Sequence, residues 1–161
     1  MAFLPTTGIG LVSMLNDIYN ERILDLAGHI PRLGRLPHPQ ASATAHSKLC
    51  GSTVTVDLEM DGDLVSDFAH DVKACALGQA SSSIMARHVV GSSAAELRAL
   101  REEMRAMLKA NGAPPSGRWK DLEVLQPVRD YKARHASTLL TFDAVVEAID
   151  KIEAGRAAVP A

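Results

Sequence analysis

The chain has two cysteines, Cys50 and Cys75, and both stand where a thiol could bind metal or act as a nucleophile. Cys50 follows a short extended stretch, whereas Cys75 follows a predicted strand and opens a predicted helix. At a helix N-terminus, unpaired backbone N–H groups and the helix dipole stabilise a thiolate. Thiolates suit zinc and iron–sulfur centres. Because two cysteines cannot fill a tetrahedral site, a metal ion or cluster here needs further ligands from this chain or another chain.

A thiol–disulfide switch is the alternative chemistry for the pair, and it requires the two Cα atoms to lie within about 7 Å of each other. We expect a cytoplasmic protein, because residues 1–5, MAFLP, carry no basic residue typical of a secretory signal. In that reducing compartment, paired cysteines more often bind metal or do redox work than form a structural disulfide. No apolar run approaches the roughly 20 residues that span a bilayer, so no membrane association is expected.

The length of 161 residues suffices for one domain with a sizeable core, which we place at about residues 12–153 of a single domain over 1–161. The formal net charge is −2, and basic residues are interleaved with acidic ones. This balance argues against a nucleic-acid partner. The sequence contains neither a Gly-rich phosphate loop nor the nucleophile elbow of a serine hydrolase, and we predict that the protein is not an enzyme.

The elements that must position the cysteines begin with a helix, predicted at 11–27, and a connector at 31–39 that is rich in Pro, Gly and Arg. Strands are predicted next, joined by a hairpin turn: 41–47, 53–60 and 64–73, with the turn at 61–63. In the middle strand, apolar and polar residues alternate, so Asp57 and Glu59 are expected on a solvated face. The pattern predicts an α+β fold, a three-stranded antiparallel sheet with helices packed on one face.

The second half of the chain is predicted to be helical. A helix at 76–90 is rich in small residues, which permit close packing. Ser93 and Glu96 form a predicted capping box for the next helix, which ends before residues 111–112. A short helical turn is expected at 119–126, and the last helix at about 138–153.

Short segments between residues 18 and 134 follow one another in an order and spacing that is specific as a set. They are an opening helix, a connector, a first cysteine, a hairpin, a second cysteine with its helix, and the stretch that leads to the last helix: IYNERILD at 18–25, PRLG at 31–34, CG at 50–51, DGDLV at 61–65, ACAL at 74–77 with ASSSIM at 80–85, and LEVLQPV at 122–128 with AR at 133–134. Together they resemble the iron–sulfur cluster assembly scaffold family of the IscU, SufU and NifU N-terminal type. The long stretch after Cys75 is most similar to the SufU branch.

That family is built around three cysteines and one aspartate, and the resemblance implies that Cys50 and Cys75 are its first two cysteines. The aspartate position is Ser52 in this chain. The third cysteine position falls at Ser137, or at Ala136 in the other alignment register. We favour Ser137 because it keeps the spacing of the SufU branch. Half of the implied ligand set is therefore missing.

Histidines are the remaining side chains that could complete a metal site. His135 is the best candidate, because it lies within two residues of the missing third cysteine and neutral imidazole binds zinc and iron. His46 and His70 are weaker candidates on the strand segments. The expected metal ligands are thus Cys50, Cys75 and His135, with one position open to water, a sulfur donor or a partner.

The resemblance implies a scaffold for iron–sulfur cluster assembly that binds iron, zinc or a nascent cluster. A cysteine desulfurase would deliver persulfide sulfur to Cys75 or Cys50, and apo iron–sulfur proteins would receive the product. Arg134 resembles the family arginine that stabilises a thiolate or persulfide beside the third cysteine. Two chains would supply four thiolates for one shared cluster, so a homodimer is a further expectation. The gaps at Ser52 and Ser137 favour an alternative, a metal-free interaction or regulatory protein that kept only the fold.

Overall fold

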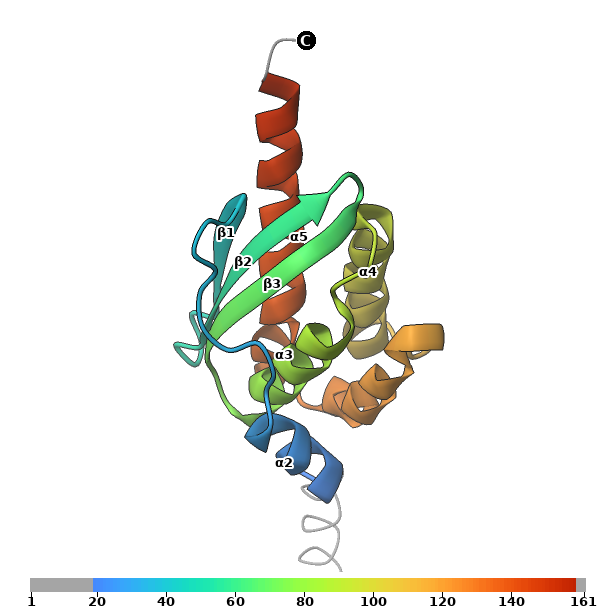
Figure 1. Ribbon diagram of the computed structural model, residues 1–161. Helices are drawn as coiled ribbons and strands as arrows, with labels where there is room; N and C mark the ends of the chain where they lie inside the picture. The colour runs from blue at the N-terminus through green and yellow to red at the C-terminus, as the bar shows by residue number, and fades with distance from the viewer. Residues whose placement is uncertain (1–18, 159–161) are drawn as a thin grey trace, which may run out of the picture.

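The computed structural model describes residues 19–158 of the chain (Figure 1). One layer is a three-stranded antiparallel sheet in the order β1-β2-β3, formed by β1 (Ala41–His46), β2 (Thr53–Asp61) and β3 (Leu64–Lys73). These strands confirm the predicted ones. Gly62 in the β2–β3 turn has a φ of 61°, a conformation that glycine adopts without strain.

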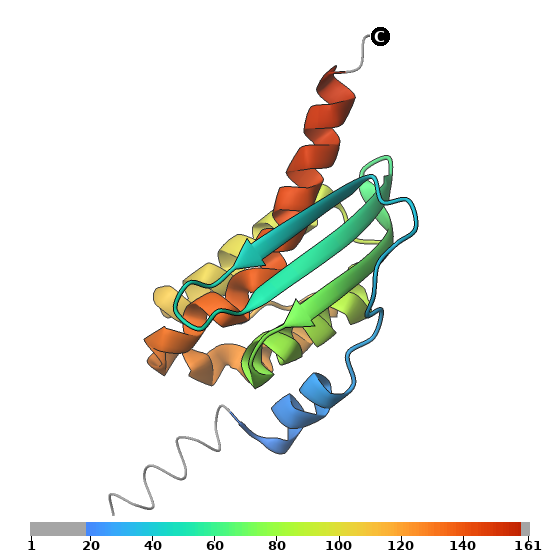
Figure 2. The same ribbon diagram turned by 90° about the vertical axis from the view of Figure 1, so that its left-hand side faces the viewer.

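Helices form the second layer: α2 (Glu21–Gly28), α3 (Ala76–His88), α4 (Ala94–Lys109), the 3-10 segments η1 (Gly117–Asp130) and η2 (Lys132–Arg134), and α5 (His135–Ala158). Helix α5 packs against β1 and β2, α3 packs against β3, and α4 packs against α5. Figure 2 shows the sheet in front of these three helices, so they all cover the same face. The predicted α+β fold is confirmed.

One hydrophobic cluster joins the two layers. It includes Val54, Val56 and Leu58, which alternate along β2 toward the helices, and Phe142 and Ile149 of α5. Among the described residues, no helix is both long enough and apolar enough to cross a membrane. A single domain over the whole chain stays a prediction.

Several helix ends differ from the predicted ones. The described part of the first helix is α2, which Asn20 caps by accepting a hydrogen bond from the Ile23 N–H at 2.9 Å; residues 11–18 of the predicted helix lie outside the described residues. Segment η1 continues past Pro127, because the fixed φ of proline is one that 3-10 helices use. Helix α5 begins at His135, three residues before the predicted start (138 − 135). The Ser93 cap of α4 is confirmed.

The expectation that Asp57 lies on a solvated face is wrong, because its side chain is 0 % exposed. The connector pairs with the edge of β3 at His70 and crosses the open face of the sheet. There Asp57 accepts two hydrogen bonds from the Arg35 guanidinium at 2.7 and 2.9 Å, one from the Leu36 N–H at 3.0 Å, and one from the Ser42 hydroxyl at 2.6 Å. The carboxylate therefore fastens the connector to the sheet.

Candidate functional site

Cys50 lies at the tip of the loop that joins β1 to β2. Two backbone hydrogen bonds close this loop: the Ser47 N–H donates to the Ser52 carbonyl, and the Gly51 N–H donates to the Ser47 carbonyl, both at 2.9 Å. Gly51 has a φ of 72°, which a residue with a side chain rarely adopts. The loop thereby holds Cys50 in an exposed position.

Hydroxyl groups surround the sulfur of Cys50. Its Sγ lies 3.4 Å from Ser47 Oγ and 3.0 Å from Ser52 Oγ. The Cys50 thiol donates to Ser47 Oγ. Hydrogen bonding with Ser47, and then with the side chain and backbone of Ser52, lowers the pKa of Cys50, desolvation opposes it, and the positive charge of Arg134 adds to the lowering. Because both serines are buried, their hydroxyls are fixed in place. The loop thus favours a nucleophilic thiolate at the protein surface.

The role of Ser47 beside the Cys50 sulfur was not predicted from the sequence. The available signal was a serine three residues before the cysteine, in a stretch whose glycine permits a closed loop. Spacing alone did not show that the Ser47 hydroxyl turns toward the sulfur.

Cys75 caps the N-terminus of α3, with extended backbone angles, and its side chain is half-buried. Its Sγ lies 3.4 Å from Ser137 Oγ, and the same hydroxyl donates to the Arg134 carbonyl at 3.2 Å. Gly78 permits this approach of α3 to α5, since a Cβ there would lie 2.7 Å from Ala74 Cβ and 3.0 Å from the Ser137 carbonyl oxygen. Of the two positions considered for the third family cysteine, Ser137 is the one in contact with the Cys75 sulfur.

The two cysteine settings emerge at the same end of the sheet. Thr53 of β2 pairs with Lys73 of β3, so the loop before Thr53 and the turn after Lys73 start side by side. The junction of η2 and α5 serves both settings, because the charge of Arg134, at the end of η2, acts on the Cys50 thiol and Ser137 of α5 contacts the Cys75 sulfur. The structure therefore gathers the predicted positions 50, 52, 75, 134 and 137 at one end of the molecule.

His135 has a different role in the structure. Its side chain is 7 % exposed, and Nε2 lies 3.1 Å from the Val128 carbonyl oxygen and 3.0 Å from the Arg129 carbonyl oxygen. A protonated Nε2 donates to these carbonyls and fastens the end of η1 to α5. The described residues contain no group of three or more His, Cys, Asp or Glu side chains that could hold a metal ion, so Cys50, Cys75 and His135 are not assembled as one ligand set.

The other histidines do not complete a site either. His46 is exposed near the end of β1. His70 is buried, its Nε2 lies 2.8 Å from the Pro31 carbonyl oxygen, and burial lowers its pKa. The donors around the cysteines are thus two thiols and the hydroxyls of Ser52 and Ser137, and a hydroxyl ionises far less readily than a thiol. This set does not fit a zinc or iron ion held by one chain.

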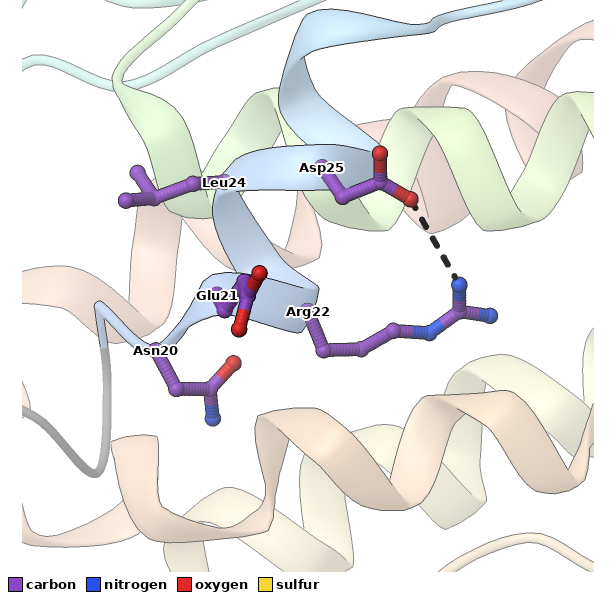
Figure 3. Close-up of a pocket in the computed structure, with 5 residues that line it drawn as sticks. All are labelled: Asn20, Glu21, Arg22, Leu24 and Asp25. Atoms are coloured by element: carbon purple, nitrogen blue, oxygen red, sulfur yellow. Dashed lines mark ion pairs between the residues drawn. The ribbon is translucent and has the colours of Figure 1, made fainter.

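A hollow of about 780 Å³ lies along α2 (Figure 3). Its described lining is one short stretch, Asn20, Glu21, Arg22, Leu24 and Asp25, in which Arg22 and Asp25 form an ion pair at 3.8 Å. Neither a thiol nor an imidazole lines it. It adds nothing to the chemistry of the cysteines.

Comparison with known proteins agrees with this geometry. The family model described as NifU-like N terminal domain matches residues 18–138. The chain belongs to the NifU-like N-terminal domain family. A crystal structure of a nitrogen-fixing NifU-like protein (N-terminal) from Brucella abortus superposes on this NifU-like domain with a TM-score of 0.86 and 64 % sequence identity, covering 88 % of this chain and 98 % of that one.

More distant relatives include a scaffold protein of iron–sulfur cluster assembly and a sulfurtransferase. The scaffold protein IscU of Thermotoga maritima is 27 % identical over 84 % of this chain and 94 % of its own length. The zinc-dependent sulfurtransferase SufU of Bacillus subtilis is 23 % identical over 88 % of this chain and 95 % of its own length. The predicted resemblance to the scaffold family is confirmed.

Proposed function

We propose that this NifU-like domain accepts sulfane sulfur on Cys50 during iron–sulfur cluster assembly, with a cysteine desulfurase as the donor. The setting of Cys50 carries the proposal: the thiol is exposed, and hydrogen bonding with Ser47 and Ser52 lowers its pKa. The thiolate is the nucleophilic form of cysteine, and an exposed thiolate is accessible to a persulfide held by another protein. Membership of the scaffold family supports the same role.

The transfer is a thiol–persulfide exchange. The Cys50 thiolate attacks the terminal sulfur of the donor persulfide, a new S–S bond forms, the donor's own S–S bond breaks, and the donor cysteine leaves as a thiolate. The terminal sulfur keeps its proton, so the exchange needs neither oxidant nor reductant. Cys75 is the second acceptor, to which the same exchange passes the sulfur. The protein is then a carrier, not an enzyme, and apo iron–sulfur proteins are the recipients of the assembled product.

No step of this scheme passes through a metal ion, because the donors of one chain do not fit one. An iron–sulfur cluster is cargo that needs four ligands, and two chains supply them as two pairs of Cys50 and Cys75. Anaerobic reconstitution with iron and sulfide, followed by size-exclusion chromatography, tests this shared arrangement. We expect cluster absorbance to elute with a homodimer, and a cluster on the monomer would contradict it.

The alternative is a metal-free interaction or regulatory protein. It is favoured by one observation, that the described residues contain no three-ligand group. Under this alternative, the protein binds an assembly partner, but neither Cys50 nor Cys75 accepts sulfur.

Site-resolved mass spectrometry separates the two functions. The protein is incubated with a cysteine desulfurase and cysteine, its persulfides are trapped by alkylation, and its peptides are mapped. We expect sulfur on Cys50 in the wild type, the same first transfer in Cys75→Ser, and no transfer in Cys50→Ser. A desulfurase that binds the protein while Cys50 stays unmodified would support the alternative.

A further inference from the structure

A pocket of about 420 Å³ adjoins the two cysteine settings. Its walls come from the β1–β2 loop, the end of α4, the 3-10 segments and the start of α5. Leu49 in its lining directly precedes Cys50, and Ala136 directly precedes Ser137, whose hydroxyl contacts the Cys75 sulfur. The volume lies in the range typical of small-molecule sites.

The charged groups of this pocket all have one sign. Lys109, Arg129 and Lys132 line it, and no Asp or Glu does among the residues that the structure describes. Within the same residues, none of these cations forms an ion pair. Several arginines elsewhere, by contrast, are matched with carboxylates, as Arg98 is with Glu153 and Arg105 is with Asp143. The pocket therefore concentrates unpaired positive charge in a hollow that reaches Leu49, the residue directly before Cys50.

Arg129 adds a cation whose position is fixed. Its Nη2 donates to the Gly112 carbonyl at 3.1 Å, which holds the guanidinium in the lining. Leu49 and Leu108 supply apolar contact in the same lining, so the pocket suits a molecule with an anionic group and a short apolar body.

We propose that this pocket binds the carboxylate end of a low-molecular-weight thiol or persulfide, which brings the sulfur of that molecule next to Cys50. This inference rests on the proposed function, because it gives Cys50 a second, diffusible source of sulfane sulfur. The Cys50 thiolate attacks the terminal sulfur of the small persulfide, the small molecule's S–S bond breaks, and its thiolate leaves. The cations of the pocket hold the carboxylate throughout and take no part in bond changes.

A pair of alkylating probes tests the pocket. Iodoacetate is an anion and iodoacetamide is neutral, and the ratio of their rates at Cys50 cancels any change in thiolate fraction. We expect the double variant Lys109→Gln/Lys132→Gln to lower this ratio by about fivefold, since focused charge raises the local concentration of anions. The control Lys120→Gln/Lys151→Gln removes the same charge outside the pocket. An equal ratio in the two double variants, or no change from the wild type, overturns the proposal.

A comparison of sulfur donors then shows which kind of donor the pocket binds. With glutathione persulfide, which carries carboxylates, transfer to Cys50 should slow about fivefold in Lys109→Gln/Lys132→Gln, whereas transfer from the neutral persulfide of mercaptoethanol should not change. Transfer from the cysteine desulfurase should also be unaffected. If the double variant instead loses desulfurase transfer alone, the pocket receives an acidic protein segment and the small-molecule proposal is wrong. If the desulfurase never loads Cys50 but the probe ratio behaves as expected, the pocket stands and the proposed desulfurase reaction fails.

Discussion

The pKa of the Cys50 thiol is lowered mainly by two hydroxyl groups of the same loop. Ser47 and Ser52 lie within hydrogen-bond reach of the sulfur, and both are buried. These contacts lower the pKa of Cys50 without a metal ion, at a sulfur that is exposed. Arg134 adds a positive charge from the end of η2.

Replacing these hydroxyls should reduce the reactivity of Cys50. A lowered pKa means that thiolate is present over a wider range and is lost only as pH falls through that lowered value. We expect Ser47→Ala and Ser52→Ala each to raise the pKa and to slow alkylation near neutral pH by about threefold. This is less than a buried hydrogen bond to a charge would give, because water screens an exposed thiolate.

The pH profile of iodoacetamide alkylation at Cys50 measures this effect. Ser66→Ala, an exposed serine of β3, is the matched control. An unchanged profile in both Ser47→Ala and Ser52→Ala would show that the hydroxyls do not stabilise the thiolate.

Ser52 and Ser137 occupy the places where the family resemblance puts two further ligands. Ser52 Oγ lies 3.0 Å from the Cys50 sulfur, and Ser137 Oγ lies 3.4 Å from the Cys75 sulfur. The double variant Ser52→Asp/Ser137→Cys should therefore gain stoichiometric zinc, because it combines three thiolates and a carboxylate. Elemental analysis of the purified protein measures the gain against wild type, and a metal-free double variant would contradict the placement of these positions.

At the scale of elements, the contact between α3 and α5 positions Cys75. Gly78 has no room for a side chain, since an added Cβ would lie 2.7 Å from Ala74 Cβ and 3.0 Å from the Ser137 carbonyl oxygen. Gly78→Ala should thus separate the helices and destabilise the protein by about 2 kcal/mol. Gly28→Ala is the control, because no atom would lie within 4 Å of its Cβ. Urea unfolding measures the free energy of unfolding of both variants. Equal values for Gly78→Ala and Gly28→Ala would mean that α3 and α5 are not in close contact at Gly78.

The attachment of the connector to the sheet depends on Asp57. Burial works to raise the pKa of Asp57, but hydrogen bonds from Arg35, Ser42 and the Leu36 N–H hold it below its ordinary value. The stabilisation is therefore present above the ordinary pKa of about 3.9 and is lost as pH falls through the lowered one.

We expect Asp57→Asn to cost about 2 kcal/mol of unfolding free energy at neutral pH and to flatten the loss of stability in acid. Asp61→Asn, at the exposed end of β2, is the control. Urea titrations at several pH values measure both variants. A variant that keeps the acid sensitivity of the wild type would show that another carboxylate causes it.

For the whole molecule, the predictable part of the structure follows from periodic patterns. Alternation in residues 53–60 predicted β2 and its buried face, because burial of one face dictates that pattern. The capping box of Ser93 and Glu96 predicted the start of α4, because a cap is a local signal. Asp57 was misplaced because its burial comes from the connector, which is distant in sequence. The same limit applies to the site: the cysteines and Ser137 could be singled out by resemblance, but the turn of Ser47 toward Cys50 depends on loop closure.

The pocket lined by Leu49 could not be predicted from the sequence either. Lys109, Arg129 and Lys132 come from three elements, and only the folded chain brings them to Leu49. The fold thus combines a stabilised thiolate, a second thiol and a basic pocket at one end of the molecule, in a chain whose family serves iron–sulfur cluster assembly.

The most direct test of this account is site-resolved sulfur loading of the metal-depleted protein in a single turnover with a persulfide-charged cysteine desulfurase. Because the Cys50 thiolate is stabilised by Ser47, Ser52 and Arg134 rather than by a metal ion, we predict that Cys50 gains one sulfur atom, and gains it before Cys75 does. Sulfur that reaches Cys75 first, or a Cys50 that stays unmodified until zinc or iron is restored, would contradict the account.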